Sequence, residues 1–352
     1  MRQESSTVQS RCDALDVAVL SALEVDARAS FSRIGAVLGV SEQTVARRYR
    51  RLCAEGGLRV VAVRDAERLG QDQWMLRVRC APDSAPVIAD ALAKRPDTHW
   101  IALASGGTEV VCGTRSHSPG DRDDLLLGRL PRTPSVVEIR AHQLLHRFFG
   151  GPTGWLRKFR ALTDDQIAAL RPGAEPDPGP ARIDPEDEPL VAALEADGRA
   201  TYPELRRATG RSESAVRRRL ATLVASGALY LDVEYDPGHL GHPFSAALWI
   251  TAAPAALHAV GEALADHDEI AYCTATAGPS NLMATTVTRD SAHLYRYLSA
   301  LMMKTPTPAS IGPVACPERL VGVLLDPVLG ARRRCRRRPG DVLVDVAVRS
   351  PE

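Results

Sequence analysis

The chain has 352 residues, with 44 lysines and arginines against 43 aspartates and glutamates. That length exceeds one ordinary domain of roughly 100–200 residues, and a composition of 45% hydrophobic and 25% charged residues excludes a wholly disordered chain. No stretch approaches the roughly 18 consecutive apolar residues of a membrane span, and the polar start MRQESSTVQS is not typical of a signal peptide, so we expect a cytoplasmic protein without a membrane partner.

The first predicted unit, residues 11–60, has the pattern of three short helices. Apolar residues recur every four positions from Leu15, and Phe31–Leu38 forms a second amphipathic stretch. Gly39 can take the left-handed conformation that ends a helix, and Ser41 offers a side-chain oxygen that caps the next helix. Two helices joined by a short glycine-containing turn are typical of a helix-turn-helix (HTH) domain.

The third of these helices carries polar and basic residues on the face opposite its buried stripe of Val45, Tyr49 and Leu52. Polar side chains near the start of such a helix read base edges in the major groove, and arginines contact phosphates. We therefore expect it to bind double-stranded DNA, while the alternative interpretation is an ordinary surface helix of an all-α subdomain. The expected base contacts are Gln43, Thr44 and Arg47, and the expected phosphate contacts are Arg48, Arg50 and Arg51.

An α+β domain is predicted at residues 71–150. The alternating stretch Leu58–Gly70 leads into it as a wing or hinge strand. Within the domain the pattern predicts the order βαββαβ, which is the ferredoxin-like arrangement. The expected strands are Gln73–Ala81, His99–Ala104, Val110–Thr114 and Ser135–Leu145, and the expected helices are Ser84–Arg95 and Gly120–Leu130.

Residues 161–189 connect this unit to the rest of the chain. A short amphipathic helix, Asp164–Leu170, precedes the segment Gly173–Pro189, which is dense in proline, glycine and acidic residues. We expect this segment to be a linker, because its composition does not sustain regular structure.

The second half of the chain repeats the first. At a constant offset of 171, Leu23–Leu58 and Leu194–Leu229 share fifteen identities over thirty-six positions, where chance gives about two or three. The register then slips by one residue. The duplication predicts a second HTH domain at residues 183–231 and a second ferredoxin-like domain at residues 242–325. The expected elements of the latter are the strands Phe244–Thr251, Ile270–Ala275, Leu282–Thr288 and Ile311–Val323 and the helices Pro254–Ala265 and Ser291–Met302.

The recognition helix of the second copy is not equivalent to that of the first. Its expected DNA contacts are Ser214, Arg217 and Arg218. The positions of Thr44, Arg50 and Arg51 are taken in the second copy by Ala215, Ala221 and Thr222. We expect the first copy to dominate sequence reading, and the second to bind more weakly, to bind without sequence preference, or to serve as scaffold.

The order of HTH domain, linking strand and ferredoxin-like domain resembles the Lrp/AsnC (feast/famine) family of transcriptional regulators, here in a tandem, double-length form. The likeness covers about Leu15–Leu145 and Ile183–Val323, and its most specific segment is DARASFSRIGAVLGVSEQTVARRYRRL. The resemblance implies a sequence-specific DNA-binding regulator that is modulated by an amino acid or another small molecule. It also implies a homo-oligomer that forms through the ferredoxin-like domains. Whether the two copies pair within one chain or between chains is left open by the sequence.

The resemblance further implies an effector site at the turn between the two middle strands, where the family pattern is similar to G-x-x-D before apolar residues. The matching positions are Gly106, Gly107 and Glu109 in the first copy and Gly278 and Asn281 in the second. Backbone N–H groups freed by glycines can bind a ligand carboxylate, and Glu109 can pair with an α-ammonium group. The alternative is a tight β-turn without a ligand.

Sirohaem decarboxylases resemble the same architecture and supply the alternative function, an enzyme of tetrapyrrole biosynthesis. That interpretation requires histidine and arginine side chains around a pocket between two such domains, for which His99 or His117 with Arg115 are candidates. The arginine-rich face of the first recognition helix favours the regulator, because an enzyme has no use for it. We therefore expect no catalytic residues.

No metal and no cofactor is expected. The seven cysteines form no CxxC pair, and the histidine pairs at residues 142/146 and 239/242 lack a third ligand at recognisable spacing. The sequence contains no P-loop, no GxSxG elbow and no dinucleotide fingerprint after a strand.

The chain closes with an arginine-rich tail at residues 331–352. Six of the seven residues in Arg332–Arg338 are arginine, which indicates either a solvated end or an arm that adds phosphate contacts. The whole sequence thus predicts an α+β protein, built from a duplicated unit of a winged HTH domain followed by a ferredoxin-like βαββαβ domain.

Overall fold

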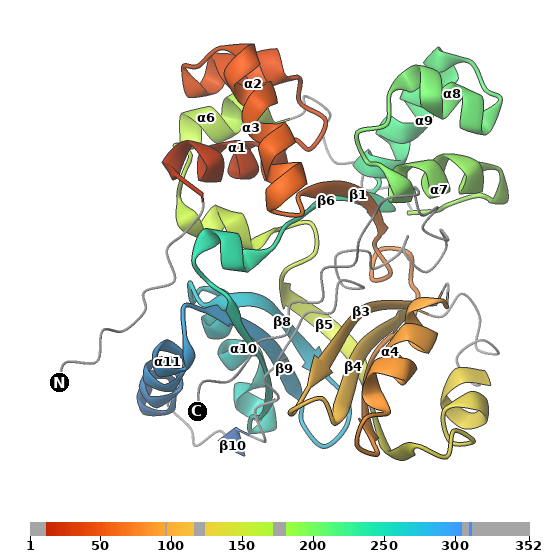
Figure 1. The fold of residues 1–352 in the computed structure, drawn as a ribbon, viewed down its shortest axis with the longest axis vertical. Coiled ribbons are helices and arrows are strands. Elements are labelled where there is room, and N and C mark those ends of the chain that lie inside the picture. Colours follow the sequence, from red (N-terminus) through yellow and green to blue (C-terminus); the bar gives the residue numbers. More distant parts are fainter. Residues whose placement is uncertain (1–11, 96, 116–123, 172–180, 305–309, 312–352) are drawn as a thin grey trace.

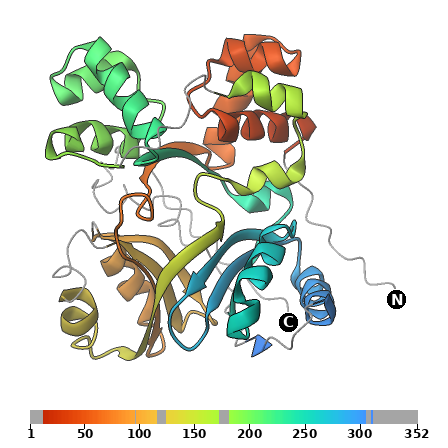
Figure 2. The ribbon, with the colours of Figure 1, turned by 180° about the vertical axis from the view of Figure 1, so that it is seen from behind.

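The computed structural model describes residues 12–95, 97–115, 124–171, 181–304 and 310–311 (Figure 1). The predicted tail at residues 331–352, His117 and the part of the last strand beyond Ile311 lie outside these residues. Two HTH domains lie side by side at one end of the molecule, and the strands of both ferredoxin-like domains lie together at the other end (Figures 1 and 2). Among the described helices, none is both long enough and apolar enough to cross a membrane.

The helices of the first HTH domain form where the pattern predicts them. They are α1 (Ala14–Val25), α2 (Phe31–Leu38) and α3 (Glu42–Glu55). Gly39 ends α2 with a φ of 69°, in the left-handed region that glycine adopts without strain. The Ser41 side chain then accepts a hydrogen bond from the backbone N–H of Thr44 and caps α3.

The second HTH domain repeats this arrangement. Its helices are α7 (Glu188–Ala196), α8 (Tyr202–Thr209) and α9 (Glu213–Ala225). Gly210 ends α8 with a φ of 69°, and the Ser212 side chain caps α9. The linker expected at Gly173–Pro189 ends earlier than its composition indicates, since the 3₁₀ helix η3 (Pro185–Asp187) leads directly into α7. Proline is tolerated there because the first turn of a helix needs no N–H donor.

The strands that follow the two HTH domains pair with each other. β1 (Arg59–Arg64) and β6 (Leu229–Glu234) form a two-stranded antiparallel sheet, and the 3₁₀ helix η4 (Pro237–Leu240) follows β6. Ala62 of β1 packs into the core of the second HTH domain, and Val233 of β6 packs into the core of the first. Val60 of β1 also lies in the first core and Leu229 of β6 in the second, so each expected wing packs into both HTH cores and each core includes a residue of the other copy.

The two ferredoxin-like domains share one eight-stranded sheet with the order β10-β7-β9-β8-β5-β2-β4-β3. The strands of the first domain are β2 (Gln73–Cys80), β3 (Thr98–Ala104), β4 (Glu109–Arg115) and β5 (Val136–Phe149). Those of the second are β7 (Phe244–Thr251), β8 (Ile270–Thr276), β9 (Leu282–Thr288) and β10 (Ser310–Ile311). The helices are α4 (Ala85–Ala93), α10 (Leu257–Ala265), which the 3₁₀ helix η5 (Pro254–Ala256) precedes, and α11 (Ser291–Lys304). Both halves have the strand order of the predicted ferredoxin-like fold.

β5 joins the two halves of the sheet. It continues beyond its predicted end at Leu145 to Phe149, because its second half pairs with β8 of the other copy. In that pairing Leu144 lies opposite Thr276, and Phe149 lies opposite Cys273. The duplicated units thus pair within one chain.

The helix expected in the second half of the first ferredoxin-like domain takes a different form in the structure. Where the sequence predicts a helix over 120–130, the described residues contain the short π-helix η1 (Asp124–Arg129). Gly128 lowers helix propensity, and Pro131 ends the segment because proline disfavours a helical conformation in the residue before it. Leu125 and Leu130 still pack into the core of this domain, so the segment covers the sheet as the predicted helix would.

Both faces of the joint sheet are covered. On the outer face, Leu76 of β2 packs against α4, and Leu248 of β7 packs against α10 and α11. On the inner face, Met75 of the first copy packs with Trp249 and Met283 of the second. The copies therefore share a core as well as strand pairing.

After β5 the chain returns to the first HTH domain. The 3₁₀ helix η2 (Trp155–Phe159) contacts α1, and α6 (Asp164–Leu170) contacts α2. Lys158 of η2 donates hydrogen bonds of 2.5–2.8 Å to three backbone carbonyls between Ala265 and Ile270. This segment therefore ties the first HTH domain to the ferredoxin-like domain of the second copy.

Candidate nucleic-acid interface

The outer face of α3 presents side chains that have no partner in the described chain. Gln43, Arg47 and Arg50 are exposed, and none of them makes a hydrogen bond or an ion pair through its side chain with another described residue. Thr44 is half-buried, and its hydroxyl lies 2.9 Å from the Ser41 hydroxyl. Two guanidinium groups and one amide of this face are thus open to an external partner.

The other two arginines of α3 hold the helix against α1. Arg48 donates to Asp13 at 2.7 Å and to Asp16 at 2.9 Å, and Arg51 also donates to Asp16. Asp16 is fully buried, and the hydrogen bond from Arg48 lowers the pKa of Asp13 below its usual value. We call these four residues the first brace. The Arg48 side chain is only 19% exposed in it, whereas that of Arg51 keeps 42% of its surface exposed.

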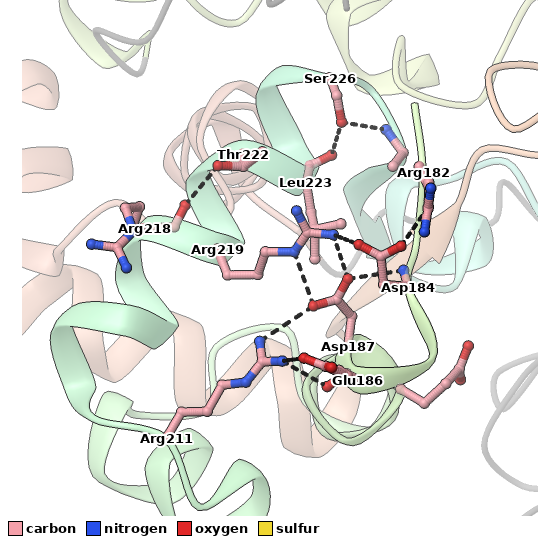
Figure 3. Close-up of polar contacts among 12 residues, drawn as sticks. Arg182, Asp184, Glu186, Asp187, Arg211, Arg218, Arg219, Thr222, Leu223 and Ser226 are labelled. Atoms are coloured by element: carbon pink, nitrogen blue, oxygen red, sulfur yellow. Dashed lines mark hydrogen bonds and ion pairs between the residues drawn. The ribbon is translucent and has the colours of Figure 1, made fainter. Parts of the chain in front are cut away.

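The second copy contains a corresponding brace, in which Asp184, Asp187 and Arg219 stand at an offset of 171 from Asp13, Asp16 and Arg48. Arg219 of α9 donates to Asp184 at 3.1 Å and to Asp187, and Arg211 donates to Asp187 at 3.3 Å (Figure 3). Burial raises the pKa of Asp187, but the hydrogen bonds from Arg219, Arg211 and the backbone N–H of Asp184, with the charge of Arg219, together outweigh burial and lower the pKa. We call this set the second brace. Sequence reasoning missed both braces, although a D-x-x-D pattern stands at residues 13–16 and again at residues 184–187.

The outer face of α9 is less open than that of α3. Arg217 donates to Glu213 at 2.7 Å, and its guanidinium carbon lies 3.6 Å from the centroid of the Tyr202 ring. The Ser214 hydroxyl lies 3.2 Å from that of the capping serine. Arg218 is exposed, forms no ion pair with another described residue, and points away from the second brace in Figure 3. Of the three contacts expected here, Arg218 alone has a side chain that nothing in the described chain engages.

Reciprocal arginine contacts hold the two HTH domains together. Arg28 donates to the two backbone carbonyls that flank Arg199, at 2.5 and 2.9 Å. Arg199 donates in turn to the two that flank Arg28, at the same distances. Arg28 also lies over the ring of Tyr202, and Arg199 lies over the ring of Phe31. Corresponding residues differ by 171, so the contacts repeat about an approximate two-fold axis.

At the first predicted effector turn, the acidic side chain is engaged within the chain. Gly106 and Gly107 have φ values of 70° and 75°, which the tight turn between β3 and β4 requires. Glu109 is buried, and its carboxylate accepts hydrogen bonds from Arg77 at 2.6 and 3.1 Å and from the Ser105 hydroxyl at 2.9 Å. A ligand ammonium group would therefore compete with Arg77 for this carboxylate.

At the second predicted effector turn, Asn281 fastens the end of a strand. Its amide oxygen accepts from the backbone N–H of Ala252, and its amide nitrogen donates to the carbonyl of the same residue, both at 2.8 Å. Gly278 has a φ of 121°, and a Cβ at this position would lie 3.0 Å from Nδ1 of His142. The turn of the second copy therefore lies directly against β5 of the first.

Between the two turns lies a polar cluster that sequence reasoning did not identify. Arg77 lies over the Trp249 ring at 5.2 Å, and His142 stacks on the same ring with 4.3 Å between centroids. Burial lowers the pKa of His142, and the charge of Arg77 lowers it further. The indole N–H of Trp249 has no hydrogen-bond partner among the described residues. The strand pattern does place Arg77 opposite the apolar face of β2, but the Trp249 ring on which it lies belongs to the other copy.

The residues of the enzyme alternative lie close together within the sheet. His99 packs on Gly113, where a Cβ would lie 2.5 Å from the imidazole Nε2. Burial lowers the pKa of His99 well below its usual value, as does the nearby charge of Arg115. Arg115 is itself buried and donates to the backbone carbonyl of Arg64 at 2.9 Å. The adjacent strands β3 and β4 thus bring these two candidates together.

Three family models match the chain. An AsnC-type helix-turn-helix domain matches residues 13–52, and a winged helix-turn-helix DNA-binding domain matches residues 190–229. An Lrp/AsnC ligand binding domain matches residues 245–311. These ranges correspond to the first HTH domain, the second HTH domain and the second ferredoxin-like domain.

Known proteins are similar to one unit or to the whole chain. An uncharacterized HTH-type transcriptional regulator of Pyrococcus abyssi is 28% identical over 124 residues, which are 35% of this chain and 78% of that protein. The HTH-type transcriptional regulator LrpA of Pyrococcus horikoshii is 25% identical over 139 residues, 39% of this chain and 99% of that protein. The crystal structure of the siroheme decarboxylase NirDL covers 87% of this chain and 91% of its own, with a TM-score of 0.55 and 12% identity, a likeness of fold alone.

The matches agree with the duplicated architecture. Each regulator aligns along most of its own length with little more than a third of this chain, as expected when it carries one unit and this chain carries two. Both HTH matches fall on the helices that carry the exposed arginines. The chain therefore belongs to the Lrp/AsnC family of DNA-binding transcriptional regulators, in a form that contains the family's unit twice.

Proposed function

We propose that the protein binds double-stranded DNA sequence-specifically, with α3 in the major groove. The observation that carries this proposal is the outer face of α3, where Gln43, Arg47 and Arg50 have no partner in the described chain and Arg48 is held back in the first brace. Glutamine pairs with adenine and arginine with guanine through two hydrogen bonds each, so Gln43 and Arg47 are assigned to bases. Arg50 and Arg51 are assigned to the phosphates that flank them.

Two alanine substitutions on α3 test this assignment. Arg47→Ala is expected to weaken specific binding by at least about 1 kcal/mol and to relax the preference at one base pair. Arg50→Ala is expected to weaken binding to all sequences about equally and to reduce the salt slope by about one unit. Arg132→Ala is the matched control, because it removes an exposed arginine from the turn between η1 and β5. Electrophoretic titration at fixed salt measures all three, and wild-type affinity of both α3 variants would refute the assigned face.

We also propose that a small-molecule effector, such as an amino acid, binds near the turns at Gly106 and Gly278. The match to a ligand binding domain includes the second turn, and the polar cluster of Arg77, His142 and Trp249 lies beside it. Thermal-shift screening of amino acids tests this, with Arg77→Met as the variant that removes the shift. If no amino acid raises the melting temperature of the wild-type chain, amino acids are excluded as the effector.

Self-association of whole chains through the ferredoxin-like domains is a further part of the proposal. It is supported by the family to which the chain belongs, whose ligand-binding domain implies oligomerisation. Sedimentation at micromolar concentration tests it, and a species of one chain mass at every concentration would contradict it.

A sirohaem decarboxylase is the second candidate function. Two observations favour it, namely the likeness of fold to NirDL over most of both chains and the position of His99 beside Arg115. Haem-type absorbance of the purified protein would support this enzyme. Retention on DNA that weakens steeply with salt would support the regulator instead, because release of counterions from DNA makes such binding salt-dependent.

A further inference from the structure

We propose that one chain reads two unlike half-sites, so that its operator is not a palindrome and the protein lies on it in one direction only. The proposal rests on the proposed function, because it requires α3 and α9 to meet DNA. Dimeric HTH proteins bind palindromes because a two-fold axis presents the same residues to both half-sites. In this protein, the two copies within one chain place their recognition helices in a similar two-fold arrangement, but the residues of the two helices differ.

Three features fix the relation between the copies within one chain. β1 pairs with β6, β5 pairs with β8, and the contacts of Arg28 and Arg199 are reciprocal. Both ribbon views show the HTH domains side by side at the same end of the molecule (Figures 1 and 2). The helices α3 and α9 are therefore related as the two recognition helices of a dimer are, and their spacing is set by a covalent chain.

The two recognition faces carry different chemistry. From the start of the helix onwards, α3 has Gln43, Thr44, Arg47, Arg50 and Arg51, and α9 has Ser214, Ala215, Arg218, Ala221 and Thr222 at the same positions. The arginine at the third position alone is shared. The face of α3 thus offers an amide and an arginine to bases and two further arginines to phosphates, whereas α9 offers one arginine and two hydroxyl groups.

The second copy has two further exposed arginines on the helix that precedes its recognition helix. Arg206 and Arg207 of α8 are exposed, whereas the corresponding positions of α2 are Gly35 and Ala36. The first helix of an HTH motif crosses the DNA backbone, so these two arginines are placed for phosphates. Arg217, the other arginine on the outer side of α9, is held by Glu213. We therefore expect the second copy to bind mainly the phosphates of the DNA backbone and to contact a single base, through Arg218.

These differences set the form of the operator. The half-site under α3 has two base pairs specified by Gln43 and Arg47, and the half-site under α9 has one specified by Arg218. A mismatched base pair typically weakens binding by about 5- to 150-fold, and separate mismatches multiply. Scrambling the α3 half-site is therefore expected to weaken binding by about 100-fold or more, and scrambling the α9 half-site by about tenfold.

The experiment is selection of bound DNA from a random pool by the full-length chain, at fixed salt, followed by sequencing. The same selection is run with the triple variant S214Q/A215T/A221R, which gives α9 the residues of α3 at three of the four positions that differ, including the base-contacting glutamine. The reverse variant Q43S/T44A/R50A serves as its matched counterpart. Ser214 and Ala221 are exposed and Ala215 is half-buried, so these substitutions lie on the surface. Circular dichroism confirms that each variant is folded.

An asymmetric wild-type motif that becomes palindromic in the S214Q/A215T/A221R variant supports the proposal. A wild-type motif in which the two half-sites read by one chain are identical and inverted overturns it and leaves the proposed function intact, because DNA is still read. Absence of any enriched sequence or of salt-sensitive retention on DNA overturns the proposed function itself, and this proposal with it. If the triple variant does not fold, the wild-type motif decides alone, since a palindrome and an asymmetric site differ without reference to any variant.

Discussion

Glu24 and Glu195 are the same residue of the repeated unit, yet the two copies use them differently. Glu24, at the end of α1, accepts hydrogen bonds from the backbone N–H groups of Leu156 at 3.0 Å and Arg157 at 2.9 Å. Glu195 forms a buried ion pair with Arg64 at 2.8 Å. Burial raises the pKa of Glu24 to about 7, although the two backbone hydrogen bonds oppose this rise. In the first copy this carboxyl group therefore changes its charge near neutral pH.

Glu24→Gln is expected to change how stability depends on pH. Because the folded-state pKa is raised, the folded chain binds the proton more tightly, and the contribution of Glu24 to stability is lost as pH rises from about 4.5 to about 7. The glutamine variant lacks this loss, so relative to wild type it gains up to about 3 kcal/mol between pH 5 and pH 8. Urea denaturation at both pH values measures the difference. Glu55→Gln, on the exposed end of α3, is the control, and an equal change there would contradict the assignment to Glu24.

Residues whose role depends on neighbours in sequence were predictable. Ser41 and Ser212 cap their helices and Gly39 ends α2, because each acts on backbone within a few residues of itself. The position of Arg77 over Trp249 was not predictable, since the two residues come from different copies. Local pattern determines which face of a strand a residue occupies, but it does not determine what that face meets.

At the scale of elements, the first brace explains why Arg48 of the basic α3 helix is not free for DNA, whereas Arg51, also bound to Asp16, stays partly exposed. In the first brace the fully buried carboxylate of Asp16 forms ion pairs with both Arg48 and Arg51. The side chain of Asp13, at the helix cap, stays about half-exposed. The duplicated brace at Arg219 repeats the arrangement although Arg51 has become threonine there. The braces therefore set how each recognition helix lies on the helix that begins its domain.

Asp16→Asn is expected to destabilise the first HTH domain more than Asp13→Asn. Removal of the buried charge leaves Arg48 without its buried partner, and breaking such a pair costs about 3 kcal/mol. The Asp13 side chain is 56% exposed, so its pair with Arg48 contributes less than about 1 kcal/mol. Urea unfolding of both variants provides the measurement, with Asp187→Asn as the same change in the second copy. Equal losses for Asp16 and Asp13 would show that burial of the brace is unimportant.

The bounds of elements were predictable wherever an element packs only against its own domain. The helices of both HTH domains follow the apolar period and the capping residues closely. β5 extends past Leu145 because its partner β8 belongs to the other copy, and no property of the local sequence records that pairing. The linker at Gly173–Pro189 was predicted too long because proline-rich composition does not separate a loop from a helix's first turn.

At the scale of the molecule, the pairing of two copies makes each half incomplete alone. β1 and β6 each contribute residues to both HTH cores, and β5 joins the two halves of the joint sheet by pairing with β2 and β8. The sequence predicted the duplicated fold and the ferredoxin-like strand order of both halves. It did not predict that the copies pair with each other, because identical patterns are compatible with pairing within or between chains.

A half-chain of residues 1–171 is therefore expected to be dimeric or larger. Alone it exposes the edges of β1 and β5, and unpaired strand edges recruit another chain. Pairing of β1 with its own copy would replace the pairing with β6 that the full chain makes. Sedimentation velocity of the half-chain measures its mass. A folded half-chain that stays monomeric at micromolar concentration would show that the strand pairing between the copies is dispensable.

The covalent union of the two recognition helices also has an evolutionary consequence. In a homodimer a single gene encodes both DNA-reading surfaces, so every point mutation alters two contacts at once. Only sites that change in both half-sites together remain matched to such a protein. Here α3 and α9 are separate stretches of one coding sequence. One recognition helix can therefore accumulate substitutions while the other keeps its contacts, so that the two halves of a bound site can diverge one step at a time.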